Sequence, residues 1–300
     1  MTKITEPGVY TLDAEAYHAD PCPMPSLSSS GARKLLKTCP ARYWHDRQNP
    51  PEPSDAFVLG SAAHEWLLEG ETWPQRHVVL PEDHDNRTKD GRARVEAIKG
   101  AGKRPVTADQ WSAIQDMKAA LDAHPFAGAA FCNGRPELSL FWRDERFGIW
   151  CRARPDWLPN AGTIVADYKT CVSAHPDDLR KSIADYGYDM QADWYMRGIK
   201  ALGLMTRPTF VFVFQEKAAP YLVTVVTLEE AALLAGAMKN DRAAATFATC
   251  LRTGRWPGYA DDVVALDIPS WEHARIDRDK ERGLYDIVNE WQAPLPEAAE

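Results

Sequence analysis

Residues 150–170 read WCRARPDWLPNAGTIVADYKT, and this stretch decides the fold that we expect. Its pattern predicts a strand that ends at 154–156, then a turn that contains Pro, Asn and Gly, and then a second strand over 163–169. A further strand is predicted at 137–143, just before this stretch. Together the segments predict a three-stranded meander.

The second strand ends with an acidic residue that is followed, two positions later, by a lysine. Because strand side chains alternate, Asp167 and Lys169 should share one face and Tyr168 should lie on the other. The turn should bring Asp156 back towards Asp167. Paired carboxylates suit a hard cation such as Mg²⁺, and a nearby ammonium can orient a bound water or stabilise a phosphate. The alternative is a salt-bridged strand pair without chemistry.

The composition is that of a soluble globular protein. The 300 residues suit one large domain or two small ones, and 45% are hydrophobic and 26% charged. No apolar run approaches the ~20 residues that span a bilayer, and the N-terminus lacks a signal peptide, so we expect a cytoplasmic protein with no membrane partner. The six Cys form no C-x-x-C pair, which predicts reduced thiols.

The charge is uneven along the chain. The net charge of −8 argues against a nucleic-acid binder. However, residues 86–104 carry seven Lys or Arg against two acidic residues, and residues 31–47 carry five against one. Such segments can hold a polyanion at one site while the bulk of the protein stays acidic. Solvated helix faces are the alternative explanation.

The predicted domain organisation has three parts. Residues 1–26 are expected to be irregular, and residues 286–300 are expected to form a disordered tail. A single domain is predicted over 27–285. It should be helical near its N-terminal end and should contain a mobile basic loop at 81–105.

Two predicted helices carry polar residues of interest. In the helix at 54–69, His64 lies on or beside the buried face together with Gly60. A histidine there is either a hydrogen-bonded core residue or a ligand. In the helix at 188–202, Gln191 and Tyr195 are four residues apart and project from one face. An ordinary amphipathic helix would also explain that pair.

Five motifs occur in a fixed order along the chain: G-S-A-A-H at 60–64 on a helix, Glu137 at the start of a strand, R-P-D at 154–156, D-Y-K-T at 167–170 and Q-x-x-x-Y at 191–195. This series resembles the PD-(D/E)xK nuclease superfamily. Within it, the sequence is most similar to the RecE-type exonucleases (exodeoxyribonuclease VIII), which are relatives of phage λ exonuclease. The resemblance extends over residues 27–271.

The resemblance implies an α/β fold with a mixed central β-sheet flanked by helices, as in restriction endonucleases. It also implies a set of metal ligands: His64, Asp156, Asp167 and the carbonyl of Tyr168. Lys169 would position or activate the attacking water. Gln191 and Tyr195 would contact DNA near the scissile phosphate, and Glu137 matches an acidic position of the family. The residues expected to bind DNA are Arg87, Lys89, Arg92, Arg94 and Arg154.

The implied cofactor is Mg²⁺, for which Mn²⁺ is expected to substitute. The iron–sulfur branch of the superfamily needs a cluster of C-terminal cysteines. Only Cys250 lies late in this chain, so we expect no iron–sulfur cluster.

The implied function is a Mg²⁺-dependent exodeoxyribonuclease that degrades linear double-stranded DNA from 5′ to 3′. The 3′ single-stranded overhangs would then serve recombination by strand annealing. The implied partners are DNA ends, a single-strand annealing protein and further copies of the chain in a ring. One alternative is a nuclease of the same fold with another substrate, RecB-like or endonucleolytic. Another is a non-catalytic module that binds DNA or a partner.

Overall fold

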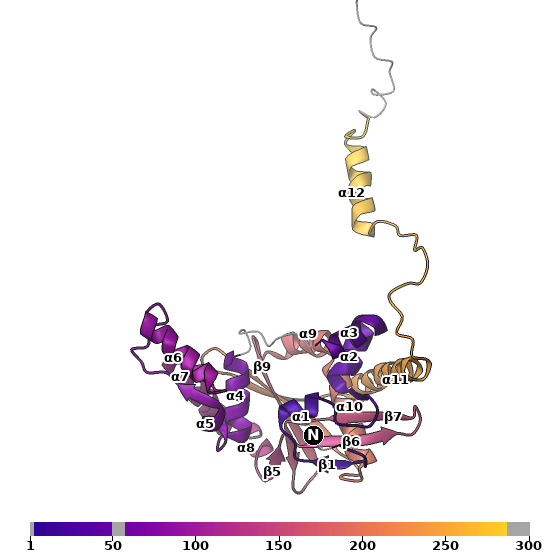
Figure 1. The fold of residues 1–300 in the computed structure, drawn as a ribbon. Helices are drawn as coiled ribbons and strands as arrows, with labels where there is room; N and C mark the ends of the chain where they lie inside the picture. The colour runs from indigo at the N-terminus through magenta and orange to yellow at the C-terminus, as the bar shows by residue number, and fades with distance from the viewer. Residues whose placement is uncertain (1–2, 50–57, 287–300) are drawn as a thin grey trace, which may run out of the picture. The chain divides into compact units, whose positions relative to one another are not determined.

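A computed structural model describes residues 3–49 and 58–286 of the chain (Figure 1). The chain forms two compact units, residues 1–258 and residues 259–300. The first unit therefore starts before residue 27 and ends before residue 285, which are the limits of the predicted domain. The predicted tail lies outside the described residues beyond residue 286.

A five-stranded mixed sheet carries the centre of the first unit, with the strand order β11-β10-β9-β8-β5. Strands β9 and β10 run parallel, and their other neighbours are antiparallel. A parallel pair needs a long crossover, and two helices between the strands supply it. The strands are β5 (Gly134–Pro136), β8 (Trp157–Pro159), β9 (Ile164–Cys171), β10 (Thr209–Glu216) and β11 (Val223–Thr227).

A second sheet has four strands in the order β1-β6-β7-β2. The prediction of one three-stranded meander is therefore wrong, since β6 and β7 pair here while β9 lies in the other sheet. Pro155 has no N–H for a strand ladder, so β7 stops and the chain enters β8 in the first sheet. The strands are β1 (Gly8–Tyr10), β2 (Ser26–Ser28), β6 (Ser139–Asp144) and β7 (Ile149–Ala153).

The N-terminal segment is ordered, and the prediction of an irregular 1–26 is wrong. Strand β1 pairs with β6, and helix α1 (Ala14–His18) is capped by the side chain of Asp13. The buried side chains of Ile4 and Tyr17 pack with those of β6 and β7. Burial of these apolar groups fixes a segment that local pattern alone left without structure.

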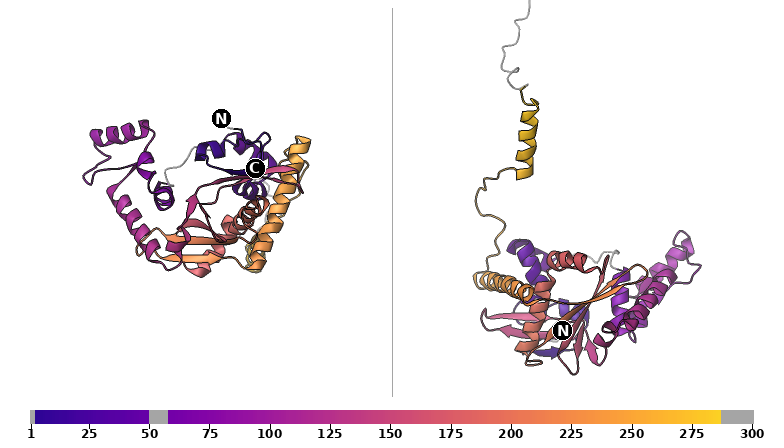
Figure 2. Two further views of the ribbon diagram at one scale, coloured as in Figure 1. Left: turned by 90° about the horizontal axis from the view of Figure 1, so that it is seen from below. Right: turned by 180° about the vertical axis from the view of Figure 1, so that it is seen from behind.

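Helices cover both faces of the five-stranded sheet (Figure 2). Phe210, Phe212 and Phe214 of β10 pack in one core with helices on one side of the sheet, whereas Val213 packs with helices on the other side. The first layer contains α2 (Ser29–Lys37), α10 (Tyr188–Ala201) and α11 (Glu230–Thr253), and α9 (Pro176–Tyr186) precedes α10. The second layer contains α4 (Val58–Glu69) and α7 (Ala108–Ala123). The predicted α/β class is thereby confirmed.

The basic segment is helical, and the prediction of a mobile loop at 81–105 is wrong. Helix α6 (Lys89–Gly100) begins after Thr88, whose hydroxyl accepts a 2.9 Å bond from the amide of Gly91. Glycine is a weak helix former, but a Cβ at residue 91 would collide with the carbonyl of Asp85. The tight start of the helix therefore explains why a glycine occupies position 91. The remaining described elements of the first unit are α3 (Pro40–Gln48), α5 (Trp73–Arg76), β3 (His77–Val79), β4 (Arg104–Val106) and α8 (Ala127–Ala130).

Gly236 lets α11 approach α10 closely, because a Cβ there would collide with the backbone carbonyl of Asp189. Backbone cannot rotate aside, so Gly236→Ala should lower the free energy of unfolding by about 1–3 kcal/mol, as overpacking does. Gly100, at the end of α6, has open space around the same position. Gly100→Ala should therefore leave the stability unchanged or slightly raised. Urea unfolding compares the two variants, and equal stabilities would contradict the close helix contact.

The second unit contains helix α12 (Ser270–Glu281), which has no buried residue. Among the residues that the structure describes, no helix has the length and apolarity needed to cross a bilayer.

Candidate active site

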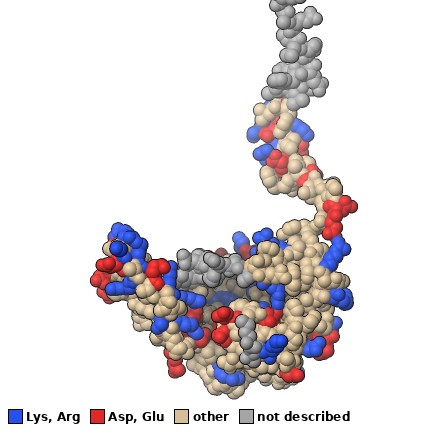
Figure 3. All heavy atoms as spheres, in the orientation of Figure 1, with Lys and Arg blue, Asp and Glu red and all other residues tan. Residues whose placement is uncertain are grey.

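One side of the first unit is hollowed, and both acidic and basic side chains reach its floor (Figure 3). A cavity of about 780 Å³ opens beside α4, and we call it the α4 cavity. Its walls come from α4, the end of β9 and the N-terminal segment. The lining includes Gly60, His64, Glu65, Glu137, Arg154 and Lys169.

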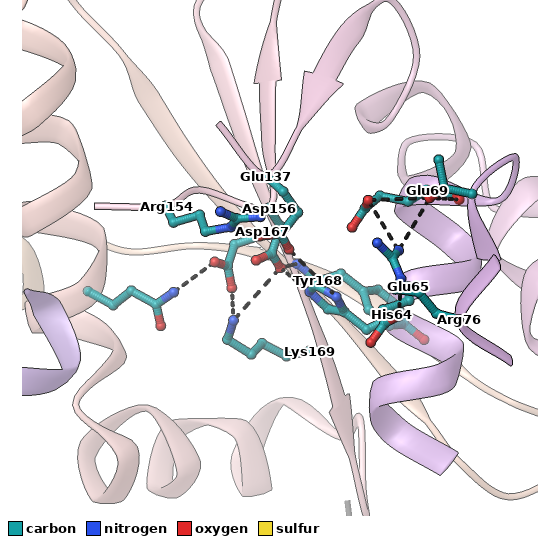
Figure 4. Close-up of polar contacts among 12 residues, drawn as sticks. His64, Glu65, Glu69, Arg76, Glu137, Arg154, Asp156, Asp167, Tyr168 and Lys169 are labelled. Carbon is teal, nitrogen blue, oxygen red and sulfur yellow. Dashed lines mark hydrogen bonds and ion pairs between the residues drawn. The ribbon is translucent and has the colours of Figure 1, made fainter. Parts of the chain in front are cut away.

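Three potential metal ligands converge at this cavity: His64 and Glu137 line it, Asp156 lies against them, and their ligand atoms all lie within 4.8 Å of one another. Nε2 of His64 lies 3.0 Å from Oδ2 of Asp156, and Nδ1 lies 3.8 Å from Oε1 of Glu137 (Figure 4). Helix α4 can bring His64 this close because Gly60, one turn earlier, packs against Thr170 of β9. Of the two interpretations of His64, this geometry favours a ligand.

Asp156 is held by the backbone of the neighbouring strand. The amide of Tyr168 donates a 2.7 Å hydrogen bond to Oδ2 of Asp156, whose residue is 8% exposed. The turn between β8 and β9 thus returns Asp156 to the end of β9, as the sequence indicated. A carboxylate fixed in this way is preorganised for binding.

The predicted alternation along β9 is confirmed. Asp167 and Lys169 form an ion pair on the side that faces α10, where Nε2 of Gln191 donates a 2.7 Å bond to Oδ2 of Asp167. Tyr168 faces the other way, and its hydroxyl donates to Oε1 of Gln215 at 2.6 Å. Nζ of Lys169 also lies 4.0 Å from Oδ2 of Asp156, so it links the two carboxylates.

Glu137 does not open a strand, contrary to the prediction, because β6 begins two residues later. Its backbone has φ = 54°, in the left-handed region that non-glycine residues rarely adopt. Such positions cost about 1–3 kcal/mol and persist where the surroundings enforce them, often at functional sites. Arg154 donates to its carboxylate and also to the carbonyl of Leu12 and the hydroxyl of Ser139. Glu137 is therefore held in place towards His64.

Three carboxylates lie close together in the cluster, and this crowding shifts the pKa values of its groups. Burial and the charge of Asp156 raise the pKa of Asp167 to about 7, although Lys169 opposes the shift. Burial and Asp156 also raise the pKa of Glu137. Burial disfavours the charged imidazole of His64, but the Asp156 carboxylate outweighs it and raises the pKa of His64 to about 9. Like charges crowded in a buried site favour protonation, or a bound cation.

These residues fit a divalent cation. Carboxylate oxygens suit Mg²⁺ and Mn²⁺, and imidazole suits transition metals better than Mg²⁺. The set differs from the predicted one in that Glu137 joins His64 and Asp156. Asp167 stands beside them, bonded to Lys169 and Gln191. The predicted role of the Tyr168 carbonyl as a ligand stays a prediction.

The predicted DNA contacts fall into two groups. Arg154 is mostly buried and is committed to Glu137, Leu12 and Ser139. The other four lie at the start of α6 or on it, all exposed: Arg87, Lys89, Arg92 and Arg94. Tyr195 lies near Gln191, as predicted, and lines a second cavity with it. The DNA-binding roles of these residues stay predictions.

The wall of the α4 cavity contains an ion-pair network that was not predicted from the sequence. Glu65 bonds Arg76 at 2.9 Å and Arg104 at 2.7 Å, and Arg76 also pairs with Glu69 at 3.2 Å. Glu65 is adjacent to His64 in the sequence, and this position could have indicated that Glu65 lies near the site. The two arginines are far apart in sequence and meet only because β3 and β4 pair in parallel, which no local pattern indicates.

Comparisons with known proteins concern the fold and the family of the chain. The chain is similar to a proposed exonuclease from Eubacterium rectale, with 13% identity and a TM-score of 0.58, over 86% of this chain and 93% of that one. At this identity the likeness concerns the fold. A protein named SSO0001 matches with 15% identity over 62% of this chain and 85% of that one, but its TM-score of 0.27 supports no argument. The sequence matches no curated protein.

Residues 28–267 match the family described as "PDDEXK-like domain of unknown function (DUF3799)". The predicted resemblance to the PD-(D/E)xK superfamily is thus confirmed, whereas the narrower resemblance to RecE-type exonucleases stays a prediction. The match includes every element of the cluster, from α4 to α10. The chain belongs to this family of PDDEXK-like domains.

Proposed function

We propose that the protein is a divalent-cation-dependent nuclease that hydrolyses phosphodiester bonds of DNA. The observation that carries the proposal is that His64, Glu137, Asp156, Asp167 and Lys169 lie together beside the open α4 cavity. A salt-bridged strand pair would need only Asp156, Asp167 and Lys169. The imidazole of His64 and the carboxylate of Glu137 have no role in such a pair.

In this proposal, His64, Glu137 and Asp156 would hold the cation, which when bound would activate water and stabilise charge on the phosphate. Asp156 stays in position through the amide of Tyr168. The ammonium of Lys169 lies where it can orient the water or neutralise developing negative charge. Both carboxylates beside Lys169 raise its pKa, although burial opposes them, which keeps it cationic.

Gln191 has a positioning role in the same proposal. Its amide fixes one oxygen of Asp167, while Lys169 bonds the other. Asp167 therefore holds the ammonium of Lys169 beside Asp156.

We further propose exonuclease activity on linear duplex DNA with 5′ to 3′ polarity. The support is the order of the motifs and their resemblance to RecE-type enzymes. A single-strand annealing protein as partner and a ring of subunits belong to the same proposal.

The experiment compares linear and closed circular duplex DNA, each incubated with the protein and Mg²⁺ or with a chelator. An exonuclease degrades only the linear DNA and only with Mg²⁺. Nicking of the circle would instead indicate an endonuclease of the same fold. Binding without hydrolysis of either substrate would indicate a non-catalytic module and would overturn the proposal.

The basic segment around α6 should contact phosphates through charge, without reading sequence. Its four exposed basic residues can be replaced together by Ala: Arg87, Lys89, Arg92 and Arg94. The dependence of log affinity on log salt should then flatten by about 0.9 for each duplex phosphate contact that is lost. Fluorescence anisotropy at several salt concentrations measures this slope. An unchanged slope would place the phosphate contacts elsewhere, with Lys37 and Arg42 of 31–47 as the next residues to replace.

A further inference from the structure

A second cavity, of about 1040 Å³, opens on the other side of Lys169, and we call it the α9 cavity. Gly60, Lys169 and Thr170 line both cavities, so the two adjoin at the candidate active site. The remainder of the lining comes mainly from α9, its junction with α10, and the loop after β9. The residues that matter here are Arg33, Lys181, Tyr186, Tyr188, Gln191 and Lys217.

Two tyrosines flank the α9–α10 junction with their rings stacked. The ring centroids of Tyr186 and Tyr188 are 5.7 Å apart and the planes differ by 28°. Tyr188 is anchored from behind, because its ring lies 5.3 Å from that of Phe212 and 5.6 Å from that of Phe214. Tyr186 is 63% exposed. An aromatic surface is therefore presented at the cavity from a fixed base.

The backbone holds the exposed tyrosine in place. Gly187 has φ = 65° and ends α9, and Nη1 of Arg33 donates a 2.7 Å bond to the carbonyl of Tyr186. A Cβ at residue 187 would come within 2.8 Å of Cδ of Arg33. Arg33 thus spans the junction, and its hydrogen bond holds the backbone of Tyr186 in place.

The tyrosine pair is close to the proposed chemistry. Nζ of Lys169 lies 5.8 Å from the ring centroid of Tyr188. The exposed cations Lys181 and Lys217 line the same cavity, together with the acidic Asp178 and Asp185. The hydroxyl of Ser173 donates a 2.7 Å hydrogen bond to the carboxylate of Asp178. Stacked aromatics next to cations are the combination by which proteins bind single-stranded nucleic acids.

The α4 cavity lacks this combination. Its one aromatic lining residue, among those described, is Tyr168, whose side chain is buried. Its guanidinium groups at Arg76 and Arg104 are already paired with Glu65 and Glu69. The two cavities therefore differ in what they can bind.

We propose that Tyr186, supported by Tyr188, is a stacking platform for an unpaired nucleotide base next to the scissile phosphate. The inference rests on the proposed nuclease function and adds that the strand to be cut lies single-stranded in the α9 cavity. The exposed Lys181 and Lys217 would contact the phosphates of this strand.

The test is a binding measurement without hydrolysis, with labelled oligothymidylate in the presence of chelator. Tyr186→Ala should weaken binding about 5- to 150-fold, which is the range for loss of one stacked base. Tyr186→Phe keeps the ring and should bind as the wild type does. Phe126→Ala, which removes an aromatic ring that is 73% exposed and lines neither cavity, is the matched control and should also bind normally.

An abasic position moved along the oligonucleotide adds a sharper comparison. At one position it should weaken binding to the wild type but not to Tyr186→Ala, because both changes remove the same stack. Equal binding by the wild type and Tyr186→Ala would overturn the inference, as would equal loss for Phe and Ala at this position. If either of these contrary results appears while the wild type still hydrolyses DNA with Mg²⁺, only the proposed stacking role of Tyr186 is overturned. If the platform signature appears without any hydrolysis, the proposed function fails and the binding site stands.

Discussion

Asp156→Asn should abolish hydrolysis of DNA while leaving the fold intact. The substitution changes no volume, and the amide oxygen can still accept the hydrogen bond from Tyr168. It removes the negative charge that lies 3.0 Å from His64, at the centre of the potential ligand set. A catalytic cation contributes several kcal/mol to the transition state, so the rate should fall by at least about 10³-fold. Single-turnover cleavage of labelled linear duplex DNA with Mg²⁺ measures the loss.

Asp144→Asn is the matched control. This carboxylate is mostly buried at the end of β6, and its partner is Arg146. Its variant should cut DNA at the wild-type rate, and the unfolding midpoints of both variants should confirm folded proteins. Wild-type turnover by Asp156→Asn would show that the cluster is a structural salt-bridge network.

Lys169→Ala should separate chemistry from binding. The side chain is 20% exposed and forms an ion pair with Asp167. Its removal leaves all three potential ligands in place and takes a positive charge away from two carboxylates, so cation affinity should hold or rise. Loss of one preorganised charge donor costs about 10²–10³ in rate. The variant should therefore bind DNA tightly and cut it very slowly.

The control for Lys169→Ala is the DNA affinity measured in chelator. A loss of affinity in proportion to the loss of rate would mean that Lys169 only anchors a phosphate. Full activity would mean that the match of residues 167–170 to the superfamily motif is coincidental.

The local geometry at the end of β9 was predictable because it depends only on strand alternation. Asp167, Lys169 and Tyr168 point as the period of two requires, and Gln191 faces Asp167 from the helix on which it was expected. The approach of Asp156 to this strand end was also predictable, although it comes through β8 and not through a meander.

Other features depend on packing between distant segments, which no local pattern contains. The N-terminal strand β1 exists because β6 offers an edge and the core buries Ile4. Glu137 enters the cluster through a left-handed backbone position that resembles an ordinary strand start in the sequence. The stacked pair of Tyr186 and Tyr188 becomes visible only when α10 is placed on the sheet.

The claim that this cluster binds the cation needed for hydrolysis is tested most directly by calorimetric titration of Mn²⁺ into the metal-free wild type and into Asp156→Asn. Imidazole and carboxylate ligands suit this ion. We expect the wild type to bind Mn²⁺ at a defined stoichiometry, and we expect Asp156→Asn to show no such binding. Identical binding curves for the two proteins, or no binding to either, would contradict the claim.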